Sequence, residues 1–422
     1  MCAASCPAPV AVCLFSLDFA ACRDIPVCIM ARQREPRFDF DTPVDRRGTG
    51  SLKWDLYQGR DIIPLWVADM DFAAPPAVIA ALKKRVSHGV FGYTLAPREL
   101  PEVVTQMLER EHGWKTDPQW LVWLPGLVTG INVVCRAVGE TGDAVMTTTP
   151  AYPPFLHAPG LSGRSLTTVP HLDDGTRSVF DFAGMEQAMT GSTRLFLLCN
   201  PQNPTGRVFT REELLRLARI CLSRGAIICS DEIHCGLVLD PDARHLSIAA
   251  LDEEIARMSI TLLSPSKTFN LPGLGFSLAV IPDNGLRERF RRAMEGIVPH
   301  VNTLGYTAAL AAYHDSEAWR SALIDYLRTN RKLVETFVAQ TPGMSMHHVE
   351  ATYLAWIDCR QLGTQDPAAF FERNGVSLSN GKDFGAPGFV RLNFGCPRGT
   401  LARALERMES AVAGQVGITR GR

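Results

Sequence analysis

Segments with a helical spacing of apolar residues alternate along the chain with short apolar runs bounded by turn residues. Apolar residues that recur every three or four positions predict helices, and short apolar runs between turn signals predict strands. The helices predicted in this way cover residues 76–88, 100–111, 130–138, 211–223 and 319–341. The predicted strands cover residues 144–147, 195–199, 226–229 and 260–263.

Strands that alternate with helices at this spacing predict α/β units around a mostly parallel sheet. The pattern changes near residue 320 to a long helix, strands at 353–357 and 389–394, and a helix from Thr400, which predicts a smaller C-terminal α+β domain. The predicted divisions are a disordered extension (1–34), an arm that contributes to the small domain (35–75), a large domain (76–318) and the small domain (319–422).

The composition is that of a globular protein, and its charge balance limits the classes of partner that the protein could bind. Of the 422 residues, 46% are hydrophobic and 21% are charged, and 43 basic residues face 44 acidic ones. This balance provides no basic field for a nucleic acid. No apolar run reaches the roughly 18 residues of a membrane helix, and the best one, 271–281, contains Pro272, Gly273 and Gly275. We expect a cytoplasmic protein that binds neither nucleic acid nor membrane.

The twelve cysteines indicate neither a metal site nor a disulfide framework. Five lie in the first 28 residues, and several others lie in apolar runs, where free cysteine behaves as a small core residue. No CxxC pair is present, so we expect no zinc site. Residues 9–17 weakly resemble the core of a signal peptide, but no basic residue precedes them and Asp18 follows. We expect a disordered extension ahead of a start at Met30.

Two strand ends carry candidate catalytic groups. The strand in MSITLLSPSKTF (258–269) ends before Ser264, Ser266 and Lys267, which suits a Schiff-base lysine flanked by hydroxyl groups for a phosphate. The alternative is a solvated loop lysine. The strand in AIICSDEIH (226–234) ends at Asp231, whose carboxylate could keep a pyridine nitrogen protonated. Strand-terminal acids that reach solvent are the alternative. A metal site at Asp231, Glu232 and His234 is disfavoured because adjacent strand residues point to opposite faces.

Four further segments carry weaker signals. Asn203 lies in the rigid turn of LLCNPQNPTGRV (197–208), and Tyr152 is held between prolines. The glycine-bearing turn at 123–130 opens a helix whose backbone N–H groups suit an anion. Arg391 lies within the apolar strand FVRLNF, where its planar fork suits a carboxylate. A surface tyrosine and an internal acidic partner for the arginine are the respective alternatives.

Four segments together resemble the motifs of fold-type I pyridoxal-phosphate enzymes of the class I/II aminotransferase superfamily. They are NPQNPTG (200–206), SDEIH (230–234), SPSKTFN (264–270) and VRLNFGCPR (390–398). Within this superfamily, three further segments resemble those of cystathionine β-lyases, or C–S lyases, of the MalY/PatB type. They are VADMDFAAPP (67–76), HGVFGYT (88–94) and ATYLAW (351–356). The resemblance covers residues 36–415. It implies a large domain with a mixed, mostly parallel seven-stranded sheet, a smaller α+β domain, and a homodimer with active sites shared across the interface.

The resemblance also implies a role for each site residue. Lys267 is the Schiff-base lysine and moves the α-proton. Pyridoxal 5'-phosphate is held by Asp231 at the ring nitrogen, Asn203 at the phenolate oxygen, Tyr152 on the ring face, and backbone groups of Leu127 and Val128 with Ser264 and Ser266 at the phosphate. Tyr93 reaches the phosphate of the neighbouring subunit, and Arg391 and Asp69 bind the substrate. Many superfamily members carry an arginine shortly after the lysine, and TFNLPGLG here has none.

These implied roles predict α,β-elimination of cystathionine or other cysteine S-conjugates to a thiol, pyruvate and ammonia. Two alternatives remain open at this point: transamination by the same residues, and a regulatory protein-binding role alongside lyase activity.

Overall fold

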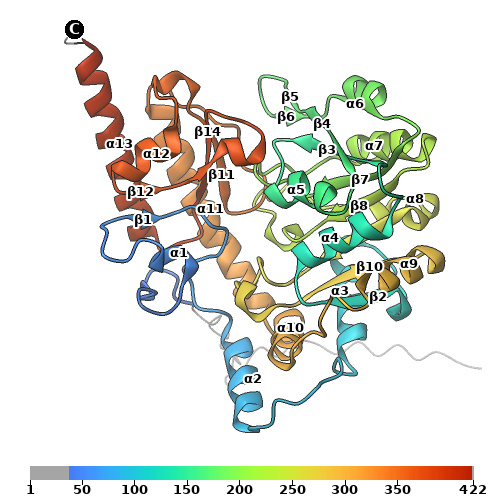
Figure 1. The fold of residues 1–422 in the computed structure, drawn as a ribbon. Helices are drawn as coiled ribbons and strands as arrows, with labels where there is room; N and C mark the ends of the chain where they lie inside the picture. Colours follow the sequence, from blue (N-terminus) through green and yellow to red (C-terminus); the bar gives the residue numbers. More distant parts are fainter. Residues whose placement is uncertain (1–37, 421–422) are drawn as a thin grey trace, which may run out of the picture. The chain divides into compact units, whose positions relative to one another are not determined.

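The largest sheet of the computed structural model, which describes residues 38–420, has seven strands and lies on the right in Figure 1. Its strand order is β2-β10-β9-β8-β7-β3-β4. Strand β10 is antiparallel to both of its neighbours and the remaining pairs are parallel, so the predicted mixed, mostly parallel sheet is confirmed. The strands are β2 (Leu121–Leu124), β3 (Ala144–Thr149), β4 (Ser165–Pro170), β7 (Thr193–Cys199), β8 (Ile227–Asp231), β9 (Ser259–Leu263) and β10 (Ser277–Val280). The predicted extension at 1–34 lies outside the described residues.

Helices cover both faces of this sheet. Alternate residues of β7 divide between two hydrophobic clusters: Leu195 and Leu197 lie in the first, and Phe196 and Leu198 lie in the second. A strand that is buried on both faces in this way reads as a continuous apolar run. Helices α4 (Leu127–Ala137), α5 (Pro153–Leu161) and α9 (Asn284–Met294) pack on one face. The other face carries α3 (Leu100–His112), α6 (Phe182–Ala188), α7 (Arg211–Ser223), α8 (Glu253–Arg257) and α10 (Thr303–Asp315).

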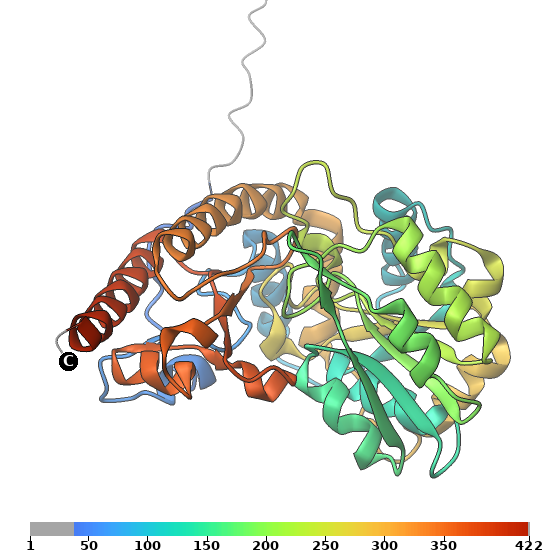
Figure 2. The same ribbon diagram turned by 90° about the horizontal axis from the view of Figure 1, so that it is seen from above.

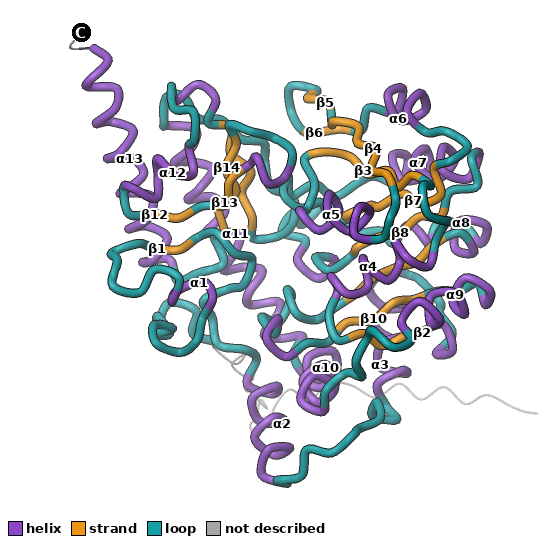
Figure 3. The backbone as a smooth tube through the Cα atoms, viewed as in Figure 1, coloured by secondary structure: helices purple, strands orange, loops and turns teal. Residues whose placement is uncertain are grey.

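A second, smaller sheet forms from the C-terminal part of the chain and lies apart from the first in the tube drawing (Figure 3). Its order is β11-β14-β13, and a two-stranded parallel pair joins β1 to β12. These strands are β1 (Ile63–Pro64), β11 (Leu354–Asp358), β12 (Val376–Ser377), β13 (Ser379–Asn380) and β14 (Phe389–Asn393). A further hairpin joins β5 (Leu172–Asp173) to β6 (Ser178–Val179).

The long helices of the C-terminal part flank the smaller sheet, with α13 at the side of the molecule away from the seven-stranded sheet (Figure 2). These helices are α11 (Glu317–Gln340), α12 (Pro367–Arg373) and α13 (Arg398–Arg420). The N-terminal elements α1 (Leu52–Asp55) and β1 lie beside them, and α2 (Pro76–Ser87) leads toward the large sheet (Figure 1). Residues 38–420 form one compact unit, so the predicted boundaries after residues 75 and 318 stay predictions.

The structure differs from the predicted elements in where some helices start and in three strands of the large sheet, β2, β4 and β10, that are not among the predicted strands. Helix α4 begins at Leu127 rather than at 130, directly after the N-cap Gly126. The last helix begins at Arg398 rather than Thr400. Part of the apolar run at 271–281 is strand β10, which lies between the edge strand β2 and β9. Within residues 38–420, no helix is both long enough and apolar enough to span a bilayer.

Candidate active site

A cavity of about 300 Å³ lies where β7, β8 and β9 end. Ligands of open α/β sheets bind beyond the carboxyl ends of the strands, and the site-bearing loops follow these ends here. The cavity brings together nine of the residues singled out from the sequence: Leu127, Val128, Tyr152, Asn203, Asp231, Ser264, Ser266, Lys267 and Arg391. Two others, Asp69 and Tyr93, do not line it.

The Lys267 amine lies inside the cavity and has one fixed hydrogen-bond acceptor. Its Nζ donates to the backbone carbonyl of Ala68 at 2.6 Å. Burial, together with the positive charge of Arg391, lowers the pKa of Lys267 to about 8, while Asp69 and Asp231 act in the opposite direction. A substantial fraction of these amines is therefore neutral near pH 8, and a neutral amine is what nucleophilic or base chemistry requires.

Asp231 is the last residue of β8 and its carboxylate is buried. Its Oδ1 accepts a hydrogen bond from the backbone N–H of Ile233 at 3.1 Å, and its Oδ2 has no hydrogen-bond partner among the described residues. Burial raises the pKa of Asp231 to about 7, against the opposing effects of the Ile233 N–H and of Lys267. A buried carboxylate with a free oxygen suits a protonated ring nitrogen, whose positive charge would offset the desolvation.

Arg391, on β14, is buried and held by three neighbours. Its guanidinium donates to Asn203 Oδ1 at 3.0 Å, to the carbonyl of Trp66 at 2.9 Å and to Ser379 Oγ at 3.1 Å. Its Nε has no partner, and burial lowers the pKa of Arg391 to about 10. Within residues 38–420, no carboxylate pairs with this guanidinium, so the alternative of an internal acidic partner is wrong for the described part of the chain. An arginine that is buried without a counter-ion is suited to a ligand carboxylate.

The first turn of α4 closes another side of the cavity. Helix α4 has no side-chain cap, and the N–H groups at the start of a helix have no partners within it. Residues 126–129 line the cavity, so these N–H groups form an anion site of the kind predicted. Across from them, Gly275 has φ 60°, and a Cβ there would come within 3.0 Å of the Pro125 carbonyl. A larger residue at 275 would press on this turn.

The two serines at this end of the cavity differ in their freedom to bind a ligand. The Ser264 hydroxyl donates to the Phe276 carbonyl at 2.7 Å and accepts from the Ser266 N–H at 3.1 Å. Its proton is therefore committed to the backbone. The Ser266 hydroxyl has no partner among the described residues, so it is the better placed of the two to donate to an anion.

The remaining predicted site residues lie in three different settings. Tyr152 lines the cavity, and burial raises the pKa of its hydroxyl. Tyr93 is fully exposed on the loop between α2 and α3, beside the exposed Phe91. Asp69 makes an ion pair with Arg46 at 2.5 Å, and its Oδ1 is buried without a partner. Asp69 does not line the cavity, so its assignment to the substrate stays a prediction.

From the sequence, His234 is considered only as a disfavoured metal ligand, but in the structure it lines the cavity. Burial, together with the charges of Lys267 and Arg391, lowers the pKa of His234 to about 3, and its Nδ1 is buried without a partner. The signal that could have found it is its position three residues after Asp231, in a turn that returns it to the same end of the sheet.

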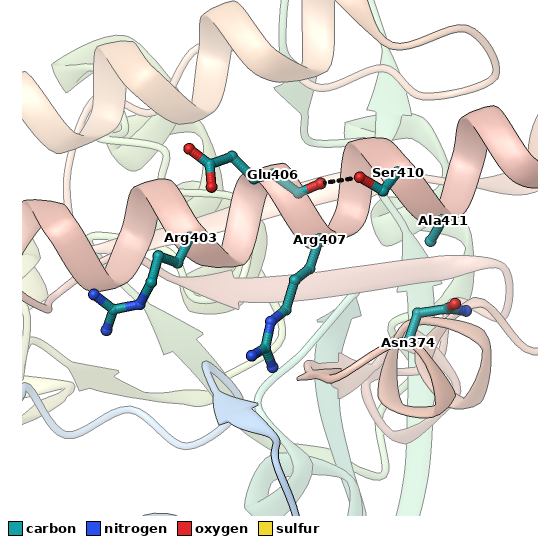
Figure 4. A pocket seen from close by; sticks show the side chains of 6 residues that line it. All are labelled: Asn374, Arg403, Glu406, Arg407, Ser410 and Ala411. Atoms are coloured by element: carbon teal, nitrogen blue, oxygen red, sulfur yellow. Dashed lines mark hydrogen bonds between the residues drawn. The ribbon is translucent and has the colours of Figure 1, made fainter.

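Glu232, next to Asp231, points away from the cavity and is hydrogen-bonded to Ser230, His245 and Ser247. Within residues 38–420, no group of three His, Cys, Asp or Glu side chains could hold a metal ion. Other hollows lie outside this cavity, and two of them are the following. One lies over α13 and is drawn in Figure 4, where Ser410 Oγ bonds to the Glu406 carbonyl. The other lies between the β5–β6 hairpin and Trp356 of β11. Neither contains the residues singled out from the sequence.

Comparisons with known proteins agree with this geometry. The family "Aminotransferase class I and II" matches residues 60–408. The chain is 37% identical to cystathionine β-lyase PatB of Bacillus subtilis, over 89% of this chain and all of the relative. It superposes on the crystal structure of OvoB with a TM-score of 0.87 and 48% identity, covering 89% of this chain and 99% of that one. The crystal structure of cystalysin from Treponema denticola, which contains pyridoxal 5'-phosphate, superposes with a TM-score of 0.86 and 32% identity. The match covers 90% of this chain and 100% of that one.

Proposed function

Because the chain belongs to the class I and II aminotransferase family, we propose that its cavity binds pyridoxal 5'-phosphate and that the protein is a carbon–sulfur β-lyase. It acts on amino acids that carry a thioether at the β-carbon, such as cystathionine and other cysteine S-conjugates. The observation that carries the proposal is a single cavity in which Lys267, Asp231 and Arg391 meet, in a chain 37% identical to a cystathionine β-lyase along that relative's whole length.

The residues of the cavity fit each part of the cofactor. The aldehyde requires an amine, and Lys267 supplies one whose pKa is lowered. The ring nitrogen requires a buried acid with a free oxygen, which Asp231 supplies. The phosphate requires N–H and O–H donors, which the first turn of α4 and Ser266 supply. We assign Asn203 to the phenolate oxygen and Tyr152 to the ring face, since both line the same cavity.

When bound, pyridoxal 5'-phosphate supplies an electron sink that stabilises negative charge at the substrate's α-carbon. The side chains of the protein supply orientation and proton transfer. Arg391 binds the α-carboxylate through a fork that no acidic side chain occupies. The Lys267 amine takes the α-proton, and holding it near that carbon gives the advantage of an intramolecular reaction.

Whether the substrate undergoes elimination or transamination depends on the leaving group at its β-carbon. Once the α-proton has moved to Lys267, a thiolate leaves with the electron pair of the C–S bond. The enamine that is released takes up water and yields pyruvate and ammonia, so the atoms of substrate and water are all accounted for. Return of the proton to another carbon would instead transfer the amino group, which is the competing aminotransferase reaction.

A homodimer with shared active sites is part of this proposal. The loop between α2 and α3 projects from the body of the protein (Figure 1) and exposes the apolar side chains Val90, Phe91, Tyr93 and Leu95. A contiguous exposed apolar segment of this kind is typical of a protein–protein interface. We assign Tyr93 to the phosphate of the partner's cofactor. We also place the protein in the cytoplasm, which is supported by the seven cysteines of residues 38–420, all of them free.

The test is release of pyruvate from cystathionine by the cofactor-loaded protein with no keto acid present. We expect continuous pyruvate and thiol formation in a 1:1 ratio. The variant Lys267→Ala should lose this activity, while Lys115→Ala, which changes an exposed lysine, should retain it. Amino transfer to an added keto acid, without thiol release, would show that the protein is an aminotransferase.

A further inference from the structure

A run of backbone carbonyls beside the cavity is unusually well bonded. All six carbonyls from Leu65 to Met70 accept hydrogen bonds, although the segment belongs to no helix or strand. The donors come from distant parts of the chain. They are Lys53, Lys267, Asn270, Tyr353, Ser379, Arg391 and Asn393, with Arg46 as a further donor to Met70. We call residues 65–70 the carbonyl segment.

Two carbonyls of this segment contact the two cationic side chains that line the cavity. The Trp66 carbonyl accepts from Arg391 at 2.9 Å, and the Ala68 carbonyl accepts from Lys267 at 2.6 Å. The guanidinium assigned to the substrate carboxylate and the amine assigned to the α-proton therefore bind to positions two residues apart on one stretch of backbone. The separation of the two groups depends on how firmly this backbone is held.

Side chains from the smaller sheet hold the segment from its other side. The Asn393 amide donates to the carbonyls of Val67 at 2.7 Å and Asp69 at 2.8 Å, the two residues on either side of Ala68. The Tyr353 hydroxyl donates to the Ala68 carbonyl itself at 2.9 Å. Both side chains are buried, and neither lines the cavity, so their hydrogen bonds act on the site through the backbone, while the Tyr353 ring also contacts the ring of His234.

Left-handed backbone occurs at one residue that holds the same segment and at the neighbour of another. In the described part of the chain, the only non-glycine residues in the left-handed region are Asn270 (φ 55°) and Thr352 (φ 74°). Asn270 follows Lys267 by three residues, and its side chain bonds to the N–H and carbonyl of Met70. Thr352 directly precedes Tyr353. Left-handed backbone is costly for a β-branched residue and persists where the surrounding structure imposes it, commonly at functional sites.

We infer that Tyr353 and Asn393 are positioning residues which, through the carbonyls of the carbonyl segment, fix the Lys267 amine relative to the Arg391 guanidinium. The inference rests on the proposed function, since it concerns the same site. A substrate whose carboxylate is bound to Arg391 presents its α-hydrogen at a set distance from that guanidinium. A shift of the amine by about 1 Å lowers the rate of proton transfer by up to about 100-fold while binding is little changed.

The test uses two variants, each with a matched control. Tyr353→Phe removes only the hydroxyl that bonds to Ala68, and Tyr57→Phe removes a tyrosine hydroxyl bonded to Ser377, away from the cavity. Asn393→Leu removes an amide that donates to two carbonyls and accepts from the Gly395 N–H, and Asn330→Leu removes a buried amide that donates to the carbonyls of Phe394 and Cys396. A purely structural role predicts that each variant behaves like its control.

In the loaded enzyme, we expect Tyr353→Phe and Asn393→Leu to lower kcat by about 10- to 100-fold with KM changed less than about threefold. The deuterium isotope effect with an α-deuterated substrate should rise, because proton transfer becomes rate-limiting. The controls should match wild type in kcat and in isotope effect, whatever their melting temperatures. Equal kcat and isotope effects in each variant and its control would overturn the inference.

A second measurement needs no cofactor. The pH dependence of reductive methylation of Lys267, followed by peptide mass spectrometry in the cofactor-free protein, reports the protonation of its amine. Arg391, Asp69, Asp231 and His234 are the charged or titratable groups that act on this amine. Loosening the Ala68 carbonyl removes a fixed acceptor that favours the charged form, so the methylation midpoint should fall in Tyr353→Phe but not in Tyr57→Phe.

The kinetic and methylation measurements distinguish failure of the proposed lyase function from failure of the positioning role of Tyr353 and Asn393. If wild type releases no pyruvate, the proposed function fails. The positioning role would still stand if the methylation midpoint moves and if exchange of a bound amino acid's α-hydrogen in D₂O slows in Tyr353→Phe. If wild type is an active lyase and neither quantity differs between variants and controls, the positioning role alone fails.

Discussion

Replacing Asp231 with Asn should stabilise the cofactor-free protein at neutral pH while abolishing its proposed activity. The Asp231 carboxylate is 2% exposed and has one backbone N–H partner, so its negative charge is poorly compensated until a ligand supplies a positive group. An amide of nearly the same shape keeps the acceptor for the Ile233 N–H and carries no charge. The variant therefore isolates the cost of holding a buried charge ready for the cofactor.

The magnitude follows from the pKa of Asp231, which burial raises from 3.8 to about 7. Each pH unit between the unfolded and folded values is worth about 1.36 kcal/mol, so ionised Asp231 destabilises the folded protein by about 4 kcal/mol. The folded state holds the proton more tightly, so this cost is absent below about pH 4, grows as the pH rises, and is complete above about pH 7. Asp231→Asn removes it, so the gain in stability should appear over that window.

The measurement is urea unfolding of the cofactor-free wild type and variant at pH 4.5, 6 and 7.5. We expect the difference in the free energy of unfolding to grow in favour of Asp231→Asn as the pH rises. With cofactor bound, wild type should have the higher free energy of unfolding, because Asn cannot stabilise a protonated ring nitrogen. The cofactor should therefore raise the stability of wild type more than that of the variant.

Asp358→Asn is a suitable control because its carboxylate pairs with Arg360 and the pKa of Asp358 is lowered, not raised. Its stability contribution is present above its unfolded pKa and is lost as the pH falls, so this variant should be destabilised at pH 7.5. The reasoning about Asp231 is refuted if Asp231→Asn is no more stable than wild type at pH 7.5, or if its advantage is independent of pH.

Three further predictions concern binding, assembly and the core. Arg391→Lys, which keeps the charge but loses the fork, should raise KM for the amino-acid substrate by about 10- to 100-fold in steady-state assays, with cofactor content unchanged. Mixing the inactive variants Lys267→Ala and Tyr93→Ala under conditions that exchange subunits should restore about a quarter of wild-type activity, because one site of each mixed dimer is intact. No recovery would contradict shared sites. Arg207→Met should lower the free energy of urea unfolding by about 3–5 kcal/mol, since it leaves the carboxylates of Glu213 and Glu350 without their buried partner, while kcat of the folded protein stays at the wild-type value.

Much of the fold could be predicted from the sequence where local pattern and tertiary environment agree. The helix at 211–223 has the predicted bounds, since Thr210 and Glu213 form a capping box that marks its start. The strand ending at Cys199 reads as an unbroken apolar run because helices cover both faces of the sheet. Strand β10 was missed: a proline and two glycines interrupt the apolar run that contains it, and only its pairing with β2 and β9 identifies it as a strand.

The candidate site could be predicted as far as its side chains follow strand ends. Lys267, Asp231 and Asn203 each come just after an apolar strand or at its end, and the carboxyl ends of parallel strands meet at one edge. His234 was missed as a cavity residue because nothing local distinguishes a ligand-facing histidine from a packed one. The carbonyl segment was missed because its chemistry is in the backbone, where residue identity gives no signal.

The charge balance of the cavity supports the dependence of the site on a second subunit. Among the residues that line it, Lys267 and Arg391 carry the cationic groups. Arg391 is assigned to the substrate carboxylate, and the Lys267 amine is assigned to the aldehyde and then to the α-proton, so neither remains for the phosphate. The segment directly after Lys267, TFNLPGLG, contains no arginine, and the Ser264 proton is committed to Phe276. The phosphate charge must therefore be balanced by the N–H groups of α4, by Ser266 and by donors from outside the chain. The exposed Tyr93 loop is suited to supply such a donor to a partner subunit, which is why the mixed-subunit experiment tests the cofactor site as well as the interface.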